Sequence, residues 1–236
     1  MISTERSSLP RAFASDKYAP KIVHLRLLKS EERVMLIAIN SQNPQMRLIK
    51  KAADVLRNGG IIIYPTDTVY GLGCDLYNKK GIEKIYRIKK RNEKQPFSFV
   101  CADLKDISRY ARVSDYAYRT MKRLLPGPYT FILEASRLVP KIILPKRLTT
   151  GIRVPDNSIC QALVGELGQP IISTSVKNEA GEIMTDPVEI EKKFRHCVDL
   201  VIDGGILAAG QSSVVSLVDD CVDVIRVGKG DVSALI

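Results

Sequence analysis

Hydroxyl, carboxylate and glycine residues gather where the sequence predicts that apolar strands end. The stretch IIIYPTDTVYGLGCD (61–75) places Thr66, Asp67 and Thr68 directly after an apolar run, and PIISTSVKN (170–178) ends its own run in hydroxyl residues. Ligands of open α/β sheets bind outside the carboxyl ends of the strands. The pattern therefore indicates either one wall of a ligand cleft or a set of polar strand exits.

Two glycines follow the first of these strand ends. Gly71 and Gly73 lack a Cβ atom, so they would let the backbone approach a ligand closely. Neither GxGxxG nor GxxxxGK[ST] is completed here, so the glycines alone specify no phosphate loop.

Cations occupy three further positions. Lys89-Lys90-Arg91 closes a predicted helix, where cations complement the helix dipole; the alternative interpretation of these residues is a phosphate clamp. Arg153 lies inside the predicted strand GIRV, and a charge there needs an internal carboxylate or an anionic ligand as partner. Near the end of the chain, Gly210, Ser212 and Arg226 supply another glycine, a hydroxyl and a cation.

Other catalytic chemistries have little support. The chain has two histidines, His24 and His196, which argues against Ser/His/Asp triads, HExxH sites and two-histidine metal centres. Its five cysteines form no CxxC pair, so neither a zinc site nor a redox dithiol is indicated, and the apolar neighbours of most of them predict buried, reduced thiols. An enzyme with this composition would work by binding and orienting phosphates.

The composition is that of an ordinary globular protein with an excess of positive charge. The 236 residues are 45% hydrophobic and carry a formal net charge of +10. This charge favours anionic partners such as nucleotides or RNA, although many basic proteins have none. No apolar run approaches the ~20 residues that a membrane span requires, so we expect no membrane association.

The elements that must position these residues alternate between helix and strand. Helices are predicted from Asn43-Pro44, from Asn78, from Ser114, over 158–167 and from Asp186-Pro187. Strands are predicted at 61–64, 97–101, 129–133, 151–154, 170–175, 198–202, 212–218 and 222–227. This order predicts a single α/β domain with a mixed, twisted sheet.

Residues 1–34 differ from the rest, and the domain is predicted over 35–236. The leader has no clear period and no apolar core of a secretory signal. Three interpretations remain open: a poorly ordered extension, an organelle transit peptide, or translation that starts at Met35. The expected location is the cytoplasm, with organelle targeting by the leader left open.

The ordered segments together resemble the YrdC-like family, the threonylcarbamoyl-AMP synthases of the tRNA t6A pathway. The resemblance rests on YPTDTVYGLGCD, KKR, PGPYTFIL, GIRVPDN, STSVKN and the closing IDGG, SSVVSL and VIRVG segments, and it covers about 35–236. It implies an open α/β fold with a large, basic, concave cavity that binds ATP, L-threonine and bicarbonate. It also implies a nucleotidyltransferase that uses Mg²⁺ with ATP and holds no tightly bound metal.

The resemblance assigns a role to each matching position. Catalytic phosphate binding falls to Lys89 and Arg91, and threonine or bicarbonate binding to Thr68, Arg153 and Ser175. The nucleotide would be bound by Lys89, Arg91, Gln95, Thr149, Lys177, Ser212 and Arg226.

Several positions depart from the family pattern and resemble its YciO-like branch. Lys177 stands where the family has asparagine, with Asn178 one residue late; Gln95 replaces a lysine, and Val100 a histidine. Two functions follow: a synthase for tRNA t6A modification, or a paralogue that binds nucleotide or double-stranded RNA with little or no synthase activity. Carbamoyl transfer to another acceptor is a third, less supported reading, and the oligomeric state stays open.

Overall fold

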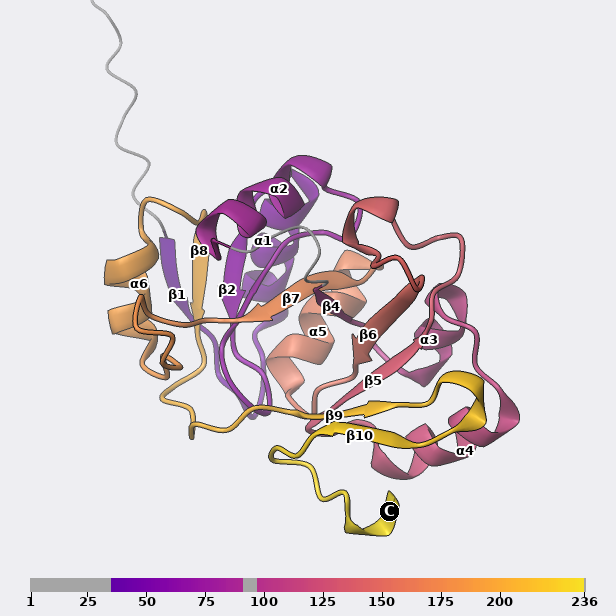
Figure 1. The fold of residues 1–236 in the computed structure, drawn as a ribbon. Coiled ribbons are helices and arrows are strands. Elements are labelled where there is room, and N and C mark those ends of the chain that lie inside the picture. Colours follow the sequence, from indigo (N-terminus) through magenta and orange to yellow (C-terminus); the bar gives the residue numbers. More distant parts are fainter. Residues whose placement is uncertain (1–34, 91–96, 236) are drawn as a thin grey trace, which may run out of the picture. The chain divides into compact units, whose positions relative to one another are not determined.

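A ten-stranded sheet organises the part of the chain that the computed structural model describes, residues 35–90 and 97–235 (Figure 1). The predicted leader, residues 1–34, lies outside the described residues. In spatial order the strands run β1-β8-β2-β3-β7-β4-β6-β5-β9-β10. Their bounds are β1 Met35–Ala38, β2 Ile62–Tyr64, β3 Gly71–Gly73, β4 Ser98–Val100, β5 Tyr129–Glu134, β6 Thr149–Arg153, β7 Ile171–Ser175, β8 Leu200–Asp203, β9 Ser213–Ser216 and β10 Asp223–Arg226.

The sheet is mixed, as the alternation of elements predicted. β8 pairs in parallel with both β1 and β2, and the β4–β6 and β5–β9 pairs are also parallel. β7 runs antiparallel to both of its neighbours, β3 and β4. Its carboxyl end therefore lies beside the amino ends of these two strands.

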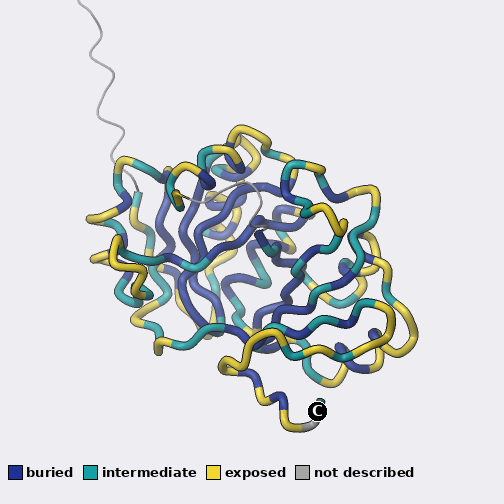
Figure 2. Tube along the Cα trace, in the orientation of Figure 1, coloured by how far each residue is buried: buried dark blue, intermediate teal, exposed yellow. Residues whose placement is uncertain are grey.

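Helices cover both faces of the sheet. Their bounds are α1 Met46–Arg57, α2 Lys79–Ile88, α3 Leu104–Tyr110, α4 Asp115–Leu124, α5 Ser158–Leu167 and α6 Pro187–Phe194. Successive side chains of β2 enter different cores, because strand side chains alternate between faces. Ile62 and Tyr64 pack with α1 and α5, and Ile63 packs into the larger cluster that holds residues of α2, α3, α4 and α6. The buried strands form the interior of the trace in Figure 2.

Capping residues set most helix starts. Asn78, Ser114 and Asp186 each accept a backbone N–H of the first turn, which confirms three predicted starts. The predicted start at Asn43-Pro44 is wrong, because α1 begins at Met46. The Asn40 side chain accepts the backbone N–H groups of Gln42 and Asn43, and this turn holds the chain out of the helix.

Besides β1, two elements were not predicted. α3 is a short helix whose N-cap, Asp103, accepts the N–H of Asp106. β3 consists of Gly71–Gly73 and lies between β2 and β7. Both escape a search for apolar periods, because one has seven residues and the other is two-thirds glycine.

No helix within 35–90 and 97–235 has the length and apolarity to span a bilayer.

Candidate anion-binding site

Two adjoining pockets open beside the carboxyl end of β7. The larger, here the lysine pocket, measures about 610 Å³ and the smaller, here the hydroxyl pocket, about 240 Å³. Charged side chains lining the lysine pocket are Lys89, Lys90, Lys177, Glu179, Lys193 and Arg226. Polar side chains lining the hydroxyl pocket alone are Ser98, Thr130, Thr149, Thr150, Arg153, Ser173 and Ser212. Thr174, Ser175 and Arg226 line both pockets.

Among the described lining residues, cations outnumber carboxylates in both pockets. Glu179 is the single carboxylate among the described residues of the lysine pocket, and it pairs with Lys193 at 3.2 Å. The two pockets therefore attract anions. The single large cavity that the resemblance implies stays a prediction.

Lys89 ties the end of α2 to β7. Its Nζ donates to the main-chain oxygen of Ser175 over 2.9 Å, and Lys89 itself is the C-cap of α2. A cation at this helix end complements the dipole, as expected, and it also lies on the wall of the lysine pocket. Both interpretations of this lysine are therefore compatible with its position.

Arg226 is oriented by Ser212, the residue before β9. Its Nε and Nη2 donate to the Ser212 main-chain oxygen over 3.1 and 2.7 Å, and Nη2 lies 3.2 Å from the Ser212 hydroxyl. That hydroxyl is 2.8 Å from the Thr130 hydroxyl. Partial burial and the like charge of Arg153 lower the pKa of Arg226. An anion bound beside Arg226 would relieve both effects.

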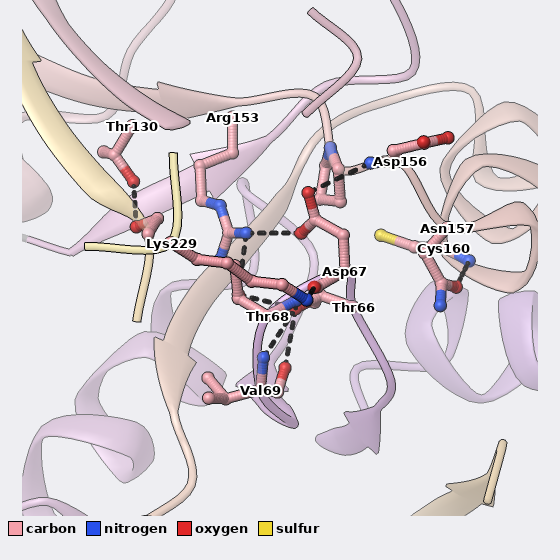
Figure 3. Close-up of polar contacts among 12 residues, drawn as sticks. Thr66, Asp67, Thr68, Val69, Thr130, Arg153, Asp156, Asn157, Cys160 and Lys229 are labelled. Atoms are coloured by element: carbon pink, nitrogen blue, oxygen red, sulfur yellow. Dashed lines mark hydrogen bonds and ion pairs between the residues drawn. The ribbon is translucent and has the colours of Figure 1, made fainter. Parts of the chain in front are cut away.

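Arg153 is buried in an ion pair with Asp67 (Figure 3). Its Nη2 lies 2.7 Å from Asp67 Oδ1 and 2.9 Å from the Thr68 hydroxyl. Asp67 Oδ2 accepts the backbone N–H of Asp156 over 3.2 Å, and Lys229 Nζ donates to the main-chain oxygen of Asp67 over 2.7 Å. Burial raises the pKa of the Asp67 carboxyl despite the opposing charge of Arg153.

Thr68 contacts Arg153 and lines neither pocket. Its side chain is 1% exposed, and its hydroxyl is 3.0 Å from that of Thr66, which donates in turn to the Val69 carbonyl. Substrate contact by Thr68 stays a prediction, and the contact that the structure does give it is to Arg153.

The positions that depart from the family pattern are only partly described. Lys177 forms an antiparallel bridge with Ile183 and lines the lysine pocket. The Asn178 side chain donates to the Glu182 carboxylate and accepts the Glu182 backbone N–H, so both of its polar atoms are used within the turn over 178–182. Arg91 and Gln95 lie outside the described residues.

The structure gives Gly71 and Gly73 a packing role, and the approach of a ligand to them stays a prediction. A Cβ atom on Gly73 would lie 2.1 Å from the Ile172 carbonyl oxygen, and one on Gly71 would lie 3.1 Å from both the Ser173 hydroxyl and the Tyr64 ring. These glycines therefore allow β3 to pack between β7 and the Tyr64 ring.

Two residues of the network, Asp67 and Lys229, were given no site role by the family resemblance. Asp67 is the internal carboxylate that the buried charge of Arg153 requires. The need for a partner follows from the sequence, but the identity of the acid does not. Lys229 comes from the segment after β10, and its long side chain extends across the network in Figure 3. No local pattern in the sequence marks it.

The three most buried cysteines should be inert toward thiol reagents. Cys74, Cys101 and Cys160 are buried, and burial raises the pKa of Cys160 to about 12, while Cys197 and Cys221 are more accessible. We expect Ellman's reagent at pH 8 to modify two thiols of the native protein and all five after unfolding in urea. A third thiol reacting rapidly in the native state would contradict this burial pattern.

Comparison with known proteins places the chain among relatives of two kinds. YciO of Escherichia coli K12 is 44% identical over 196 residues, which cover 82% of this chain and 95% of that protein. Human threonylcarbamoyl-AMP synthase is 34% identical over 181 residues, which cover 77% of this chain and 64% of that protein.

Solved structures give the same result. The crystal structure of E. coli YciO matches with a TM-score of 0.82 and 42% identity, covering 86% of this chain and all of that one. The structure of P. abyssi Sua5 complexed with L-threonine matches with a TM-score of 0.73 and 26% identity, covering 78% of this chain and 54% of that one. These matches confirm the α/β fold predicted from the motifs.

A family model completes the comparison. The Sua5/YciO/YrdC model, described as telomere recombination, matches residues 54–228. This range includes Asp67, Arg153 and the whole of β7. The match spans most of the chain and agrees with the resemblance of its motifs. The chain therefore belongs to the Sua5/YciO/YrdC family.

Proposed function

We propose that this protein is an ATP-dependent L-threonylcarbamoyl-adenylate synthase that supports t6A modification of tRNA. The observation that carries the proposal is the shared wall of the two pockets, where Thr174, Ser175 and Arg226 face both. A small amino acid and a nucleotide bound on the two sides of this wall would bring their reacting groups together. Threonylcarbamoyl-AMP synthases among the relatives support this choice.

In this proposal the residues act by positioning and by neutralising charge. The threonine amine bonds to the carbon of bicarbonate with loss of water, which gives a carbamate. A carbamate oxygen then attacks the α-phosphorus of ATP, and the bond to the pyrophosphate leaving group breaks. Arg153 and Ser175 would hold the carbamate, while Lys89 and Arg226 would offset its repulsion from the triphosphate.

The remaining positions would hold the nucleotide. Thr149 and Ser212 would bind its hydroxyl groups, and Lys177 would meet a phosphate oxygen. A magnesium ion would neutralise the phosphates when bound. Since Glu179 is the single carboxylate among the described lining residues of the lysine pocket, phosphates and water would supply most of its ligands.

Pyrophosphate release tests the proposal. We expect release only when ATP, L-threonine and bicarbonate are all present, because the carbamate must form before ATP is attacked. The Lys89→Ala variant should lose about tenfold or more of the rate, since it removes a phosphate-facing charge. Lys105→Ala, on the exposed side of α3, is the matched control and should retain wild-type activity. Release that does not depend on threonine would overturn the proposal.

A second candidate function is favoured by one observation. Lys177 replaces the family asparagine, and Asn178 is engaged with Glu182 rather than available to a ligand. A nucleotide- or double-stranded-RNA-binding protein with little synthase activity would fit this arrangement. In that case Lys177→Asn should raise pyrophosphate release above the wild-type level, and RNA affinity should fall steeply with salt. An unchanged rate in Lys177→Asn would argue against this candidate.

A further inference from the structure

Arg153 has hydrogen-bond donors that the described part of the protein does not use. A guanidinium carries five N–H groups, and both of those on Nη2 are directed to Asp67 and Thr68. No described residue accepts a hydrogen bond from Nε, which is buried. Arg153 lines the hydroxyl pocket, where Thr150 also has a buried hydroxyl without a partner among the described residues.

Asp67 is itself held on three sides. Its Oδ1 meets Arg153 Nη2, its Oδ2 accepts the Asp156 backbone N–H, and its main-chain oxygen accepts Lys229 Nζ. Both carboxylate oxygens are engaged by protein donors, and the side chain is 8% exposed. What the arrangement does is fix the plane and direction of one guanidinium (Figure 3).

We infer that Asp67 is a positioning residue that orients Arg153 so that its remaining N–H groups bind a carboxylate-class oxyanion in the hydroxyl pocket. Lys229 assists by holding the main chain of Asp67 in place. The inference rests on the proposed function for the identity of the natural oxyanion, which would be the threonine carboxylate or the carbamate.

The charge of Asp67 and its geometry predict opposite effects on anion binding. A carboxylate beside Arg153 repels an incoming anion, so a purely electrostatic role predicts that Asp67→Asn binds anions more tightly than wild type. A positioning role predicts weaker binding, because the guanidinium is no longer held in one orientation. The sign of the change therefore separates positioning from charge neutralisation.

Equilibrium binding of acetate and of L-threonine, followed by NMR titration, tests the inference without requiring turnover. We expect Asp67→Asn to weaken both by about tenfold or more, in line with the loss of a charge-assisted hydrogen bond. Threoninamide, which lacks the carboxylate, should bind wild type and variant equally. Asp223→Asn, an exposed acid on β10, is the matched control and should bind acetate as wild type does.

A second variant covers loss of folding in Asp67→Asn. Lys229→Ala removes one exposed side chain and should weaken acetate binding in the same direction by a smaller factor. Equal or tighter acetate binding by a folded Asp67→Asn overturns the inference, as does unchanged binding by Lys229→Ala if Asp67→Asn is unfolded. Acetate binding that depends on Asp67, in a protein that does not bind threonine, would uphold the positioning role and reject the proposed function.

Discussion

Arg153→Ala is expected to lower the free energy of unfolding by about 3–5 kcal/mol, the usual cost of removing one partner of a buried ion pair. Both side chains of the Arg153–Asp67 pair are 8% exposed, so the variant would leave the Asp67 carboxylate buried without its counter-charge. The Thr68 hydroxyl would lose its donor as well. Urea denaturation monitored by circular dichroism measures the change.

An exposed ion pair of the same type provides the control for Arg153→Ala. Arg112 and Glu134 are 3.2 Å apart, but their side chains are 82% and 43% exposed. Arg112→Ala should therefore change the free energy of unfolding by less than about 1 kcal/mol. If the two arginine variants lost equal stability, burial would not be the reason that the Arg153 pair matters. Arg153→Ala combined with Asp67→Ala should lose less than the sum of the single changes.

Gly73→Ala is expected to destabilise the protein by about 3 kcal/mol or more, or to prevent cooperative folding. The added Cβ atom would lie 2.1 Å from the Ile172 carbonyl oxygen and 2.8 Å from Ile171 Cγ2. The first of these is a backbone atom of a paired strand, so β3 and β7 would have to separate to admit it. Thermal and urea unfolding both report the loss.

Gly165→Ala is the matched glycine replacement, and it should have the opposite sign. Gly165 lies inside α5, and apart from its chain neighbours and the adjacent backbone of its own helix, no heavy atom of the protein lies within 4 Å of its hypothetical Cβ. Alanine there should stabilise the protein by about 0.5–1 kcal/mol, because glycine loses more backbone freedom when a helix forms. A stabilising Gly73→Ala would show that the close approach of β3 to β7 is wrong.

Local signals in the sequence were enough to predict most elements of the fold. Asn78, Ser114 and Asp186 mark helix starts because a capping side chain acts on backbone groups two or three residues away. The start of α1 was predicted wrongly because Asn40, not Asn43, controls that turn. β3 could not be predicted from periodicity, since its glycines record contacts with strands that lie elsewhere in the sequence.

The site shows the same division between local and distant contacts. The need of Arg153 for a partner follows from its place in an apolar strand, and the structure supplies Asp67, 86 residues away in the chain. Lys229 is 162 residues from the Asp67 carbonyl oxygen to which it donates. Such pairings depend on the order of strands in the sheet, which one sequence does not reveal. Contact of the predicted side chains with a substrate stays a prediction.

The wall that Thr174, Ser175 and Arg226 give to both pockets has a thermodynamic consequence. Two ligands that contact the same three side chains are expected to have coupled affinities. Whatever factor the first ligand imposes on the affinity of the second, the second must impose on the first. The order of arrival can change the rates, but the free energy of the doubly occupied state is the same by either route. Measuring one affinity with and without the other ligand therefore gives the coupling in both directions.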